Sequence, residues 1–122
     1  LGSRGLGDVY KRQEKGSRYE EAAAAFLQKQ GLTLLEKNFR SRFGEIDLIL
    51  KDGAYLVFTE VKYRADGSLG YPLEAVDLRK QKRIRDTARY FMYIRKIPED
   101  TPCRFDVVGF TGGNLQWILN AF

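Results

Sequence analysis

The sequence contains no histidine and a single cysteine among its 122 residues. Histidine-based catalytic triads, histidine-ligated metal centres, zinc clusters and disulfide frameworks therefore have no residues from which to form. No apolar run approaches the roughly 18 residues of a membrane span, and no charged-then-apolar leader opens the chain. Carboxylates and lysines must carry any chemistry, and we expect a reducing, cytoplasmic setting with no membrane partner.

The surplus of positive charge is moderate. There are 21 Lys and Arg residues against 16 Asp and Glu, a formal net charge of +5. Such a surface favours anionic partners and permits nucleic acid without establishing it. Hydrophobic residues make up 43% of the chain, which is enough for one globular domain with a modest core.

The first thirteen residues have no helical or strand periodicity. Residues 8–13, Asp-Val-Tyr-Lys-Arg-Gln, resemble the translation of a transposon mosaic-end adapter read into a truncated gene. We therefore interpret residues 1–13 as a probable adapter-derived, non-native segment, which would leave the true amino terminus missing. Residues 14–122 are then a single domain.

The periodicity of the remaining chain predicts an α/β domain with a mixed sheet. Helices are expected at residues 17–30 and 73–96, strands at 32–39, 45–51, 54–63, 104–110 and 115–119, and a loop at 64–72. The two central strands flank Asp52-Gly53, the pair most favoured in a two-residue hairpin turn. Tyr90, Phe91 and Trp117 are expected in the core rather than as platforms for nucleobases.

A turn at Asp52-Gly53 fixes the register of the central hairpin. It places Asp47 opposite Phe58 and Glu45 opposite Glu60, so that Asp47 and Glu60 are diagonal neighbours. They share a face that is apolar near the turn and charged toward the open end. The role of Glu45 stays open.

Two carboxylates about 6 Å apart repel by about 3 kcal/mol at an effective dielectric constant near 20. In a half-apolar setting, a cation or a proton is therefore expected between Asp47 and Glu60. Both can ligate a hard cation such as Mg²⁺, and Lys62 on the same face could orient and deprotonate a water molecule or stabilise phosphate charge. The commoner alternative for an isolated Glu-x-Lys pattern is an ordinary surface ion pair.

The combination of motifs goes further. Asp47 followed by Glu60-Val61-Lys62 resembles the PD-(D/E)xK signature of restriction-endonuclease-like nucleases. More closely, the chain is similar to the YraN family of bacterial proteins, itself similar to Holliday-junction resolvases. The matching segments are Asn38-Phe39-Arg40, residues 44–49, 58–64, 74–76 and 104–108, and the closing Asn120-Ala121-Phe122.

This resemblance implies a three-layer α/β/α restriction-endonuclease-like fold around a central mixed sheet. It implies a nuclease acting on DNA, with branched or structured DNA as a candidate substrate, Mg²⁺ or Mn²⁺ as cofactor and a homodimer as a candidate assembly. The metal ligands would be Asp47 and Glu60, with Lys62 as the catalytic lysine. Glu20 matches the first-helix carboxylate of the family, although a solvated helix charge is an equal alternative.

Basic residues near the carboxylates could bind a nucleic-acid backbone. The candidates are Arg40, Arg42, Arg64, Lys80 and Arg83. Lys80 lies on the inward stripe of the second helix, where extension toward the edge of the sheet is the commoner outcome. The alternative function is a non-catalytic nucleic-acid-binding or assembly module on a nuclease scaffold, which would bind in a salt-sensitive way without turnover.

Overall fold

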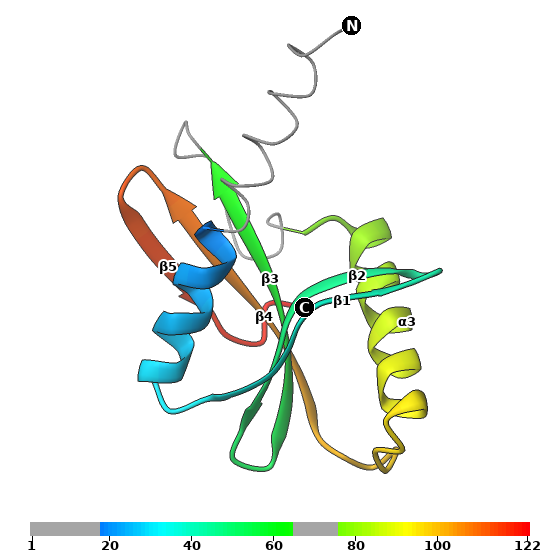
Figure 1. Cartoon of the computed structure of the whole chain (residues 1–122). Helices are drawn as coiled ribbons and strands as arrows, with labels where there is room; N and C mark the ends of the chain where they lie inside the picture. The colour runs from blue at the N-terminus through cyan, green and yellow to red at the C-terminus, as the bar shows by residue number, and fades with distance from the viewer. Residues whose placement is uncertain (1–17, 65–75) are drawn as a thin grey trace, which may run out of the picture.

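The computed structural model describes residues 18–64 and 76–122. The segment 1–13 and nearly all of the expected loop at 64–72 lie outside these ranges. A five-stranded sheet with the order β1-β2-β3-β4-β5 forms the middle layer (Figure 1). Its strands are β1 (Thr33–Ser41), β2 (Gly44–Asp52), β3 (Tyr55–Arg64), β4 (Cys103–Thr111) and β5 (Asn114–Ile118).

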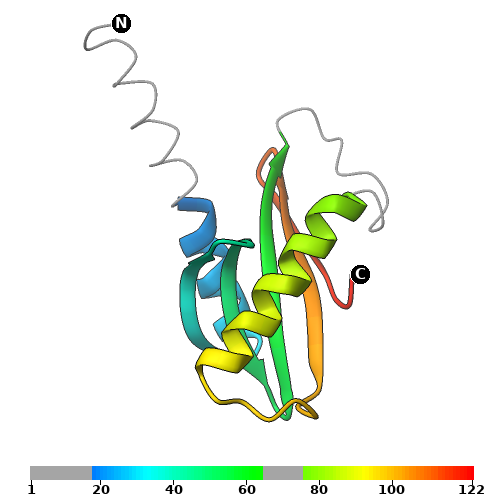
Figure 2. The same ribbon diagram turned by 90° about the vertical axis from the view of Figure 1, so that its right-hand side faces the viewer.

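The sheet is mixed, as predicted. β3 and β4 are parallel, whereas the other neighbouring pairs are antiparallel. Because parallel neighbours need a crossover connection, α3 (Leu78–Ile94) lies between them in sequence and packs across one face of the sheet (Figure 2). The helix at residues 18–29 covers the other face. The three-layer α/β/α architecture is therefore confirmed.

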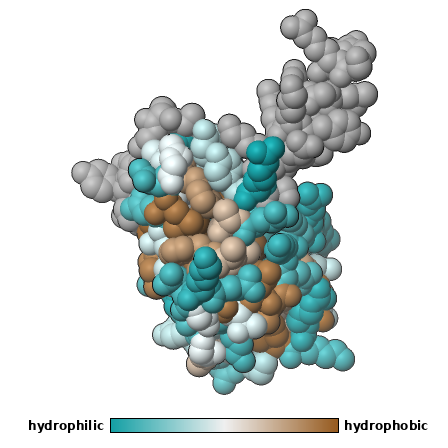
Figure 3. Space-filling view, turned by 60° about the vertical axis from the view of Figure 1, so that its left-hand side comes forward, coloured by the Kyte–Doolittle hydropathy of each residue, from teal (hydrophilic) through white to brown (hydrophobic). Residues whose placement is uncertain are grey.

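Two buried clusters hold the layers together. Phe39, Ile49 and Phe58 pack with Ile84 and Phe91 beneath α3. On the opposite face, the helix at 18–29 packs Ala23 and Leu27 against Leu48, Val57 and Val108. Apolar surface shows between hydrophilic side chains on the side of the molecule that carries this helix and β5 (Figure 3).

The second helix begins later than the expected residue 73. Its N-cap is Asp77, whose Oδ1 accepts a hydrogen bond from the backbone N–H of Lys80 at 2.8 Å. This bond satisfies one of the free N–H groups of the first turn, so the carboxylate fixes the start of the helix. None of the helices in the two described ranges is long and apolar enough to cross a membrane.

The predicted register of the central hairpin is wrong by two residues. Asp52 pairs with Tyr55, and the turn consists of Gly53 and Ala54. Gly53 has φ +59° at the first central position, where a type II′ turn takes glycine. Because the shift is an even number of residues, Leu48, Ile49 and Leu50 keep their predicted faces, whereas Asp47 and Glu60 lie beyond the last paired residues and are not diagonal neighbours in the ladder.

Candidate active site: a carboxylate cleft between β2, β3 and α3

The strands β2 and β3 part where the charged residues begin. Their pairing ends with Leu48 opposite Thr59. Beyond that point β2 turns with β1 toward α3 (Figure 1). Ile46, which strict alternation would place on the same face as Leu48, instead packs in the core beneath α3. On β1, Asn38 has φ +52°, outside the extended region of a regular strand. The parting strands leave a gap that regular pairing would have closed.

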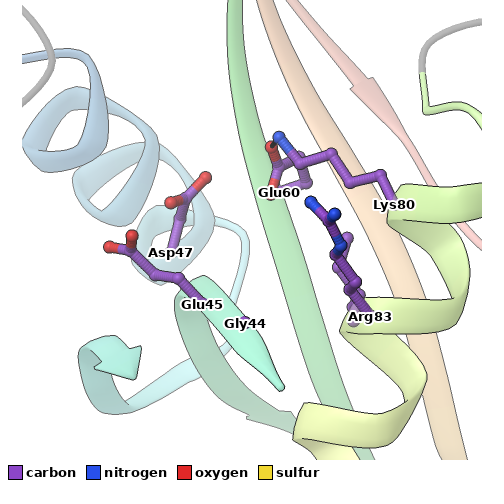
Figure 4. A pocket seen from close by; sticks show the side chains of 7 residues that line it. Gly44, Glu45, Asp47, Glu60, Lys80 and Arg83 are labelled. Atoms are coloured by element: carbon purple, nitrogen blue, oxygen red, sulfur yellow. Dashed lines mark ion pairs between the residues drawn. The ribbon is translucent and has the colours of Figure 1, made fainter. Parts of the chain in front are cut away.

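This gap is a cavity of about 240 Å³, which we call the carboxylate cleft (Figure 4). Two strands and one helix supply its walls. The lining residues are Gly44, Glu45 and Asp47 from β2, Glu60 from β3, and Lys80, Arg83 and Ile84 from α3.

Asp47 is fixed by the backbone of the neighbouring strand. Its Oδ2 accepts a hydrogen bond from the N–H of Val61 at 2.8 Å, in the direction where a continued ladder would offer a backbone carbonyl. Burial, together with repulsion from Glu60, raises the pKa of Asp47 to about 8, although the bond from Val61 opposes the rise. A nearby cation would remove this penalty.

Glu60 is 6% exposed and forms an ion pair with the ammonium group of Lys80. Burial lowers the pKa of that ammonium group, but the charge and hydrogen bond of Glu60 outweigh it, so the pKa of Lys80 is raised. The expectation that Lys80 extends toward the edge of the sheet is therefore wrong, because a buried carboxylate draws it into the cleft.

Neither Lys62 nor Glu20 lines the cleft, but both interact electrostatically with Glu60. Burial and the positive charge of Lys80 lower the pKa of Lys62. The neutral amine of Lys62 is therefore easier to form than that of an exposed lysine. Burial raises the pKa of Glu20 despite a hydrogen bond from the side chain of Asn38, and repulsion from Glu45 and Glu60 adds to the rise.

The predicted basic contacts divide into two groups. Arg83 joins Lys80 in the wall of the cleft, and Arg40 pairs with Glu45 at 3.4 Å. Arg42 instead lies in the β1–β2 turn, and Arg64 is an exposed residue at the end of β3. The structure thus brings Asp47, Glu60, Lys80 and Arg83 together, and it leaves Arg42 and Arg64 outside the cleft.

Three further residues shape the site. Glu45 adds a carboxylate to the cleft wall, Asn38 binds Glu20, and Gly44 lets the β1–β2 turn approach α3 closely. A β-carbon at Gly44 would lie 3.3 Å from Thr87 Oγ1. In the sequence, an asparagine within a predicted strand and a glycine next to one both suggest an unusual local backbone. Neither indicates that Asn38 would contact Glu20 or that Gly44 would contact α3.

The donor set suits a hard divalent cation. No group of three or more His, Cys, Asp or Glu side chains within residues 18–64 and 76–122 lies close enough to hold a metal ion. Mg²⁺, however, is usually bound by one or two carboxylates, with water and substrate phosphate completing its shell. Asp47 and Glu60, whose mutual repulsion a cation would relieve, are the residues that would hold it.

Comparison with known proteins places the sequence among bacterial relatives. A family model described as "Uncharacterised protein family UPF0102" matches residues 19–110. The chain is similar to a UPF0102 protein of Nitrosomonas europaea, with 48% identity over 111 residues, 88% of this chain and 92% of the relative. It is also similar to a UPF0102 protein of Lachnoclostridium phytofermentans, with 45% identity over 108 residues, 88% and 92% of the two chains.

Proposed function

The chain belongs to the uncharacterised protein family UPF0102, and from this premise we propose that it is a divalent-cation-dependent DNA endonuclease whose active centre is the carboxylate cleft. The predicted resemblance to the YraN family is confirmed, since that name denotes the same family. The observation that carries the proposal is the convergence of Asp47 and Glu60 on one cleft beside Lys80. An ordinary surface ion pair, the alternative for Glu60 and Lys62, would not bring a second carboxylate into the same cleft.

Each residue has a role in phosphodiester hydrolysis. A bound Mg²⁺ or Mn²⁺ would supply Lewis-acid stabilisation of the phosphate and activation of a water molecule. Asp47 and Glu60 present the oxygen ligands, and the lowered pKa of Lys62 suits an amine that accepts a proton from the attacking water. Glu20 does not line the cleft, but its charge acts on Glu45 and Glu60.

The lysine paired with Glu60 has a second role. The ammonium group of Lys80 balances the buried carboxylate of Glu60. If Glu60 held a cation, the ammonium group of Lys80 would be available to a substrate phosphate, as would the guanidinium group of Arg83 beside it. The cleft therefore offers both carboxylates for a cation and cationic side chains for the DNA backbone.

We expect Asp47→Asn to abolish metal-dependent cleavage of DNA while the fold is retained. The amide keeps the size of the side chain but removes the charge on which a metal ligand depends. Cleavage of fluorescently labelled duplex, single-stranded, flap and four-way-junction DNA is measured with Mg²⁺, Mn²⁺ or EDTA, and circular dichroism monitors the fold. The matched control is Asp100→Asn, because Asp100 is exposed in the connection after α3.

Two outcomes of this experiment would contradict the proposed endonuclease activity. Cleavage that the Asp47→Asn protein retains would contradict the proposal. Salt-sensitive DNA binding by the wild-type protein without cleavage of any substrate would support a non-catalytic binding module instead.

A further inference from the structure

The β1–β2 turn lies on α3 and separates the carboxylate cleft from a second depression. Gly44 lines the cleft, whereas its neighbour Phe43 lines the depression. The contact between turn and helix is close, since a β-carbon at Gly44 would lie within 3.4 Å of both Thr87 and Arg83. Two consecutive residues therefore face two adjoining cavities.

The second depression is a cavity of about 370 Å³, which we call the aromatic hollow. Its α3 residues recur at helical spacing on one side of the helix. Its lining residues are Phe43, Asp86, Arg89, Tyr90 and Tyr93.

The aromatic side chains of the hollow are unusually accessible. Phe43 is 36% exposed, Tyr90 39% and Tyr93 80%, whereas Phe91 on the opposite side of α3 is only 3% exposed. The prediction that Phe91 lies in the core is confirmed, but the same prediction for Tyr90 is wrong, because Tyr90 lies on the exposed side of α3. The rings of Phe43 and Tyr90 lie 5.9 Å apart and tilted by 60°.

The charge around these rings is positive. The guanidinium group of Arg42 lies 4.9 Å from the ring centroid of Phe43, and Arg89 lines the hollow. Among the lining residues within 18–64 and 76–122, the only acidic one is Asp86, which is balanced by Lys82 at 2.8 Å and by Arg89 at 4.0 Å. Aromatic faces beside guanidinium planes, without a free carboxylate, match the stacking preference of nucleobases next to phosphate.

We propose that the aromatic hollow binds an unpaired nucleobase of the strand whose phosphate enters the carboxylate cleft. This inference rests on the proposed function, because it names the substrate class of that site. A base in an intact duplex is stacked and cannot enter, so the preferred DNA carries unpaired nucleotides at the scissile strand, as at flaps, branch points and single-stranded ends. Tyr93 and Phe43 supply the exposed rings, and Arg42, which lies over the ring of Phe43, neutralises a flanking phosphate.

The test compares normal and abasic DNA, which have the same phosphates but differ in their bases. Binding of a fluorescein-labelled single-stranded oligothymidylate and of the abasic strand of equal length is followed by anisotropy in EDTA. We expect the Phe43→Ser, Tyr93→Ser double variant to bind the oligothymidylate about tenfold more weakly than wild type, with unchanged affinity for the abasic strand. Tyr55→Ser is the matched control, because Tyr55 is 46% exposed in β3 and belongs to neither cavity.

Several outcomes would overturn the inference. These are equal wild-type affinity for the two strands, no binding of either, an equal loss for both in the double variant, or a change of oligomeric state in the variant, which would identify the hollow as a protein interface. Because binding is measured without divalent metal, it is independent of cleavage. Base-dependent binding without cleavage would reject the proposed endonuclease yet retain the hollow as a base site.

Discussion

The surroundings of Asp47 disfavour the ionised form of its carboxyl group. It is oriented by the N–H of Val61, but burial and the neighbouring Glu60 raise its pKa to about 8. A group whose pKa is higher in the folded than in the unfolded state binds protons more tightly when folded. The metal-free protein therefore gains stability from the protonated form of Asp47, and it loses that gain as the pH rises from about 4 to about 8.

Because the pKa of Asp47 is raised, replacing its carboxyl group by an amide should stabilise the protein. In EDTA at pH 8, we expect Asp47→Asn to raise the free energy of unfolding by about 1 to 3 kcal/mol, since the amide avoids burying a charge. The advantage should shrink toward pH 5. Thermal and urea unfolding across this range measure it. An Asp47→Asn protein that is less stable than wild type at every pH would contradict the assignment.

Added Mg²⁺ gives the complementary observation. A ligand that binds only the folded state raises its stability according to concentration and affinity. Mg²⁺ should therefore stabilise the wild-type protein at pH 8 and leave Asp47→Asn unchanged. Asp100→Asn, an exposed carboxylate outside the cleft, should respond to Mg²⁺ as the wild-type protein does.

Among the elements, the β1–β2 hairpin determines where the cleft opens. Its turn touches α3 through Gly44, which has φ +153° and no room for a β-carbon without displacing Thr87 or Arg83. The same turn carries Phe43 into the aromatic hollow. A change at Gly44 should therefore disturb both cavities, whereas a change at a distant turn should disturb neither.

We expect Gly44→Ala to lower the free energy of unfolding by about 1 to 3 kcal/mol and to weaken DNA binding and cleavage together. The matched control is Gly112→Ala in the β4–β5 turn. Gly112 also has positive φ, at +59°, but a β-carbon there would meet nothing within 4 Å. Urea unfolding and anisotropy separate the two effects. Loss of DNA binding in the Gly112 variant, or unchanged binding in the Gly44 variant, would argue against the role of this contact.

The hairpins also illustrate what local sequence determines. The last turn lies where the strands predicted at 104–110 and 115–119 left room for it, at Gly112-Gly113, with Thr111 paired to Asn114. Asp52-Gly53 misplaced the central turn, because Asp52 is held as a strand residue by an ion pair with Arg104 at 3.0 Å. That contact spans 52 residues, so no rule about turn residues contains it.

At the scale of the whole molecule, alternating polarity and helical spacing were sufficient for the element order and the mixed sheet. Alternation also gave the faces of Leu48, Ile49 and Phe58 correctly, but it failed at Ile46, beyond the last pair of β2 and β3. It could not locate Lys80, whose position depends on how α3 packs over β3, nor the parting of β2 from β3. Long-range packing therefore decides which side chains meet in the cleft, while the local pattern decides the elements that carry them.

A second buried charge cluster maintains the fold away from the cleft. Asp106 is fully buried and accepts hydrogen bonds from Arg104 Nε at 2.9 Å, Trp117 Nε1 at 3.0 Å and the backbone N–H of Asn120 at 2.9 Å. It thereby joins β4 to β5 and to the turn that follows. None of these residues lines the carboxylate cleft.

We therefore expect Asp106→Asn to separate stability from activity. Removing one partner of a buried ion pair leaves the other charge uncompensated, at a cost of about 3 to 5 kcal/mol. Calorimetry should show a Tm lower by more than about 10 °C. Asp52→Asn, which removes a half-exposed partner of the same arginine, should lower the free energy of unfolding by about 1 kcal/mol or less.

Below the Tm of the Asp106→Asn protein, cleavage per folded molecule should match wild type, because the cleft lies on other elements. A large loss of cleavage in fully folded Asp106→Asn would mean that the cluster also positions the site.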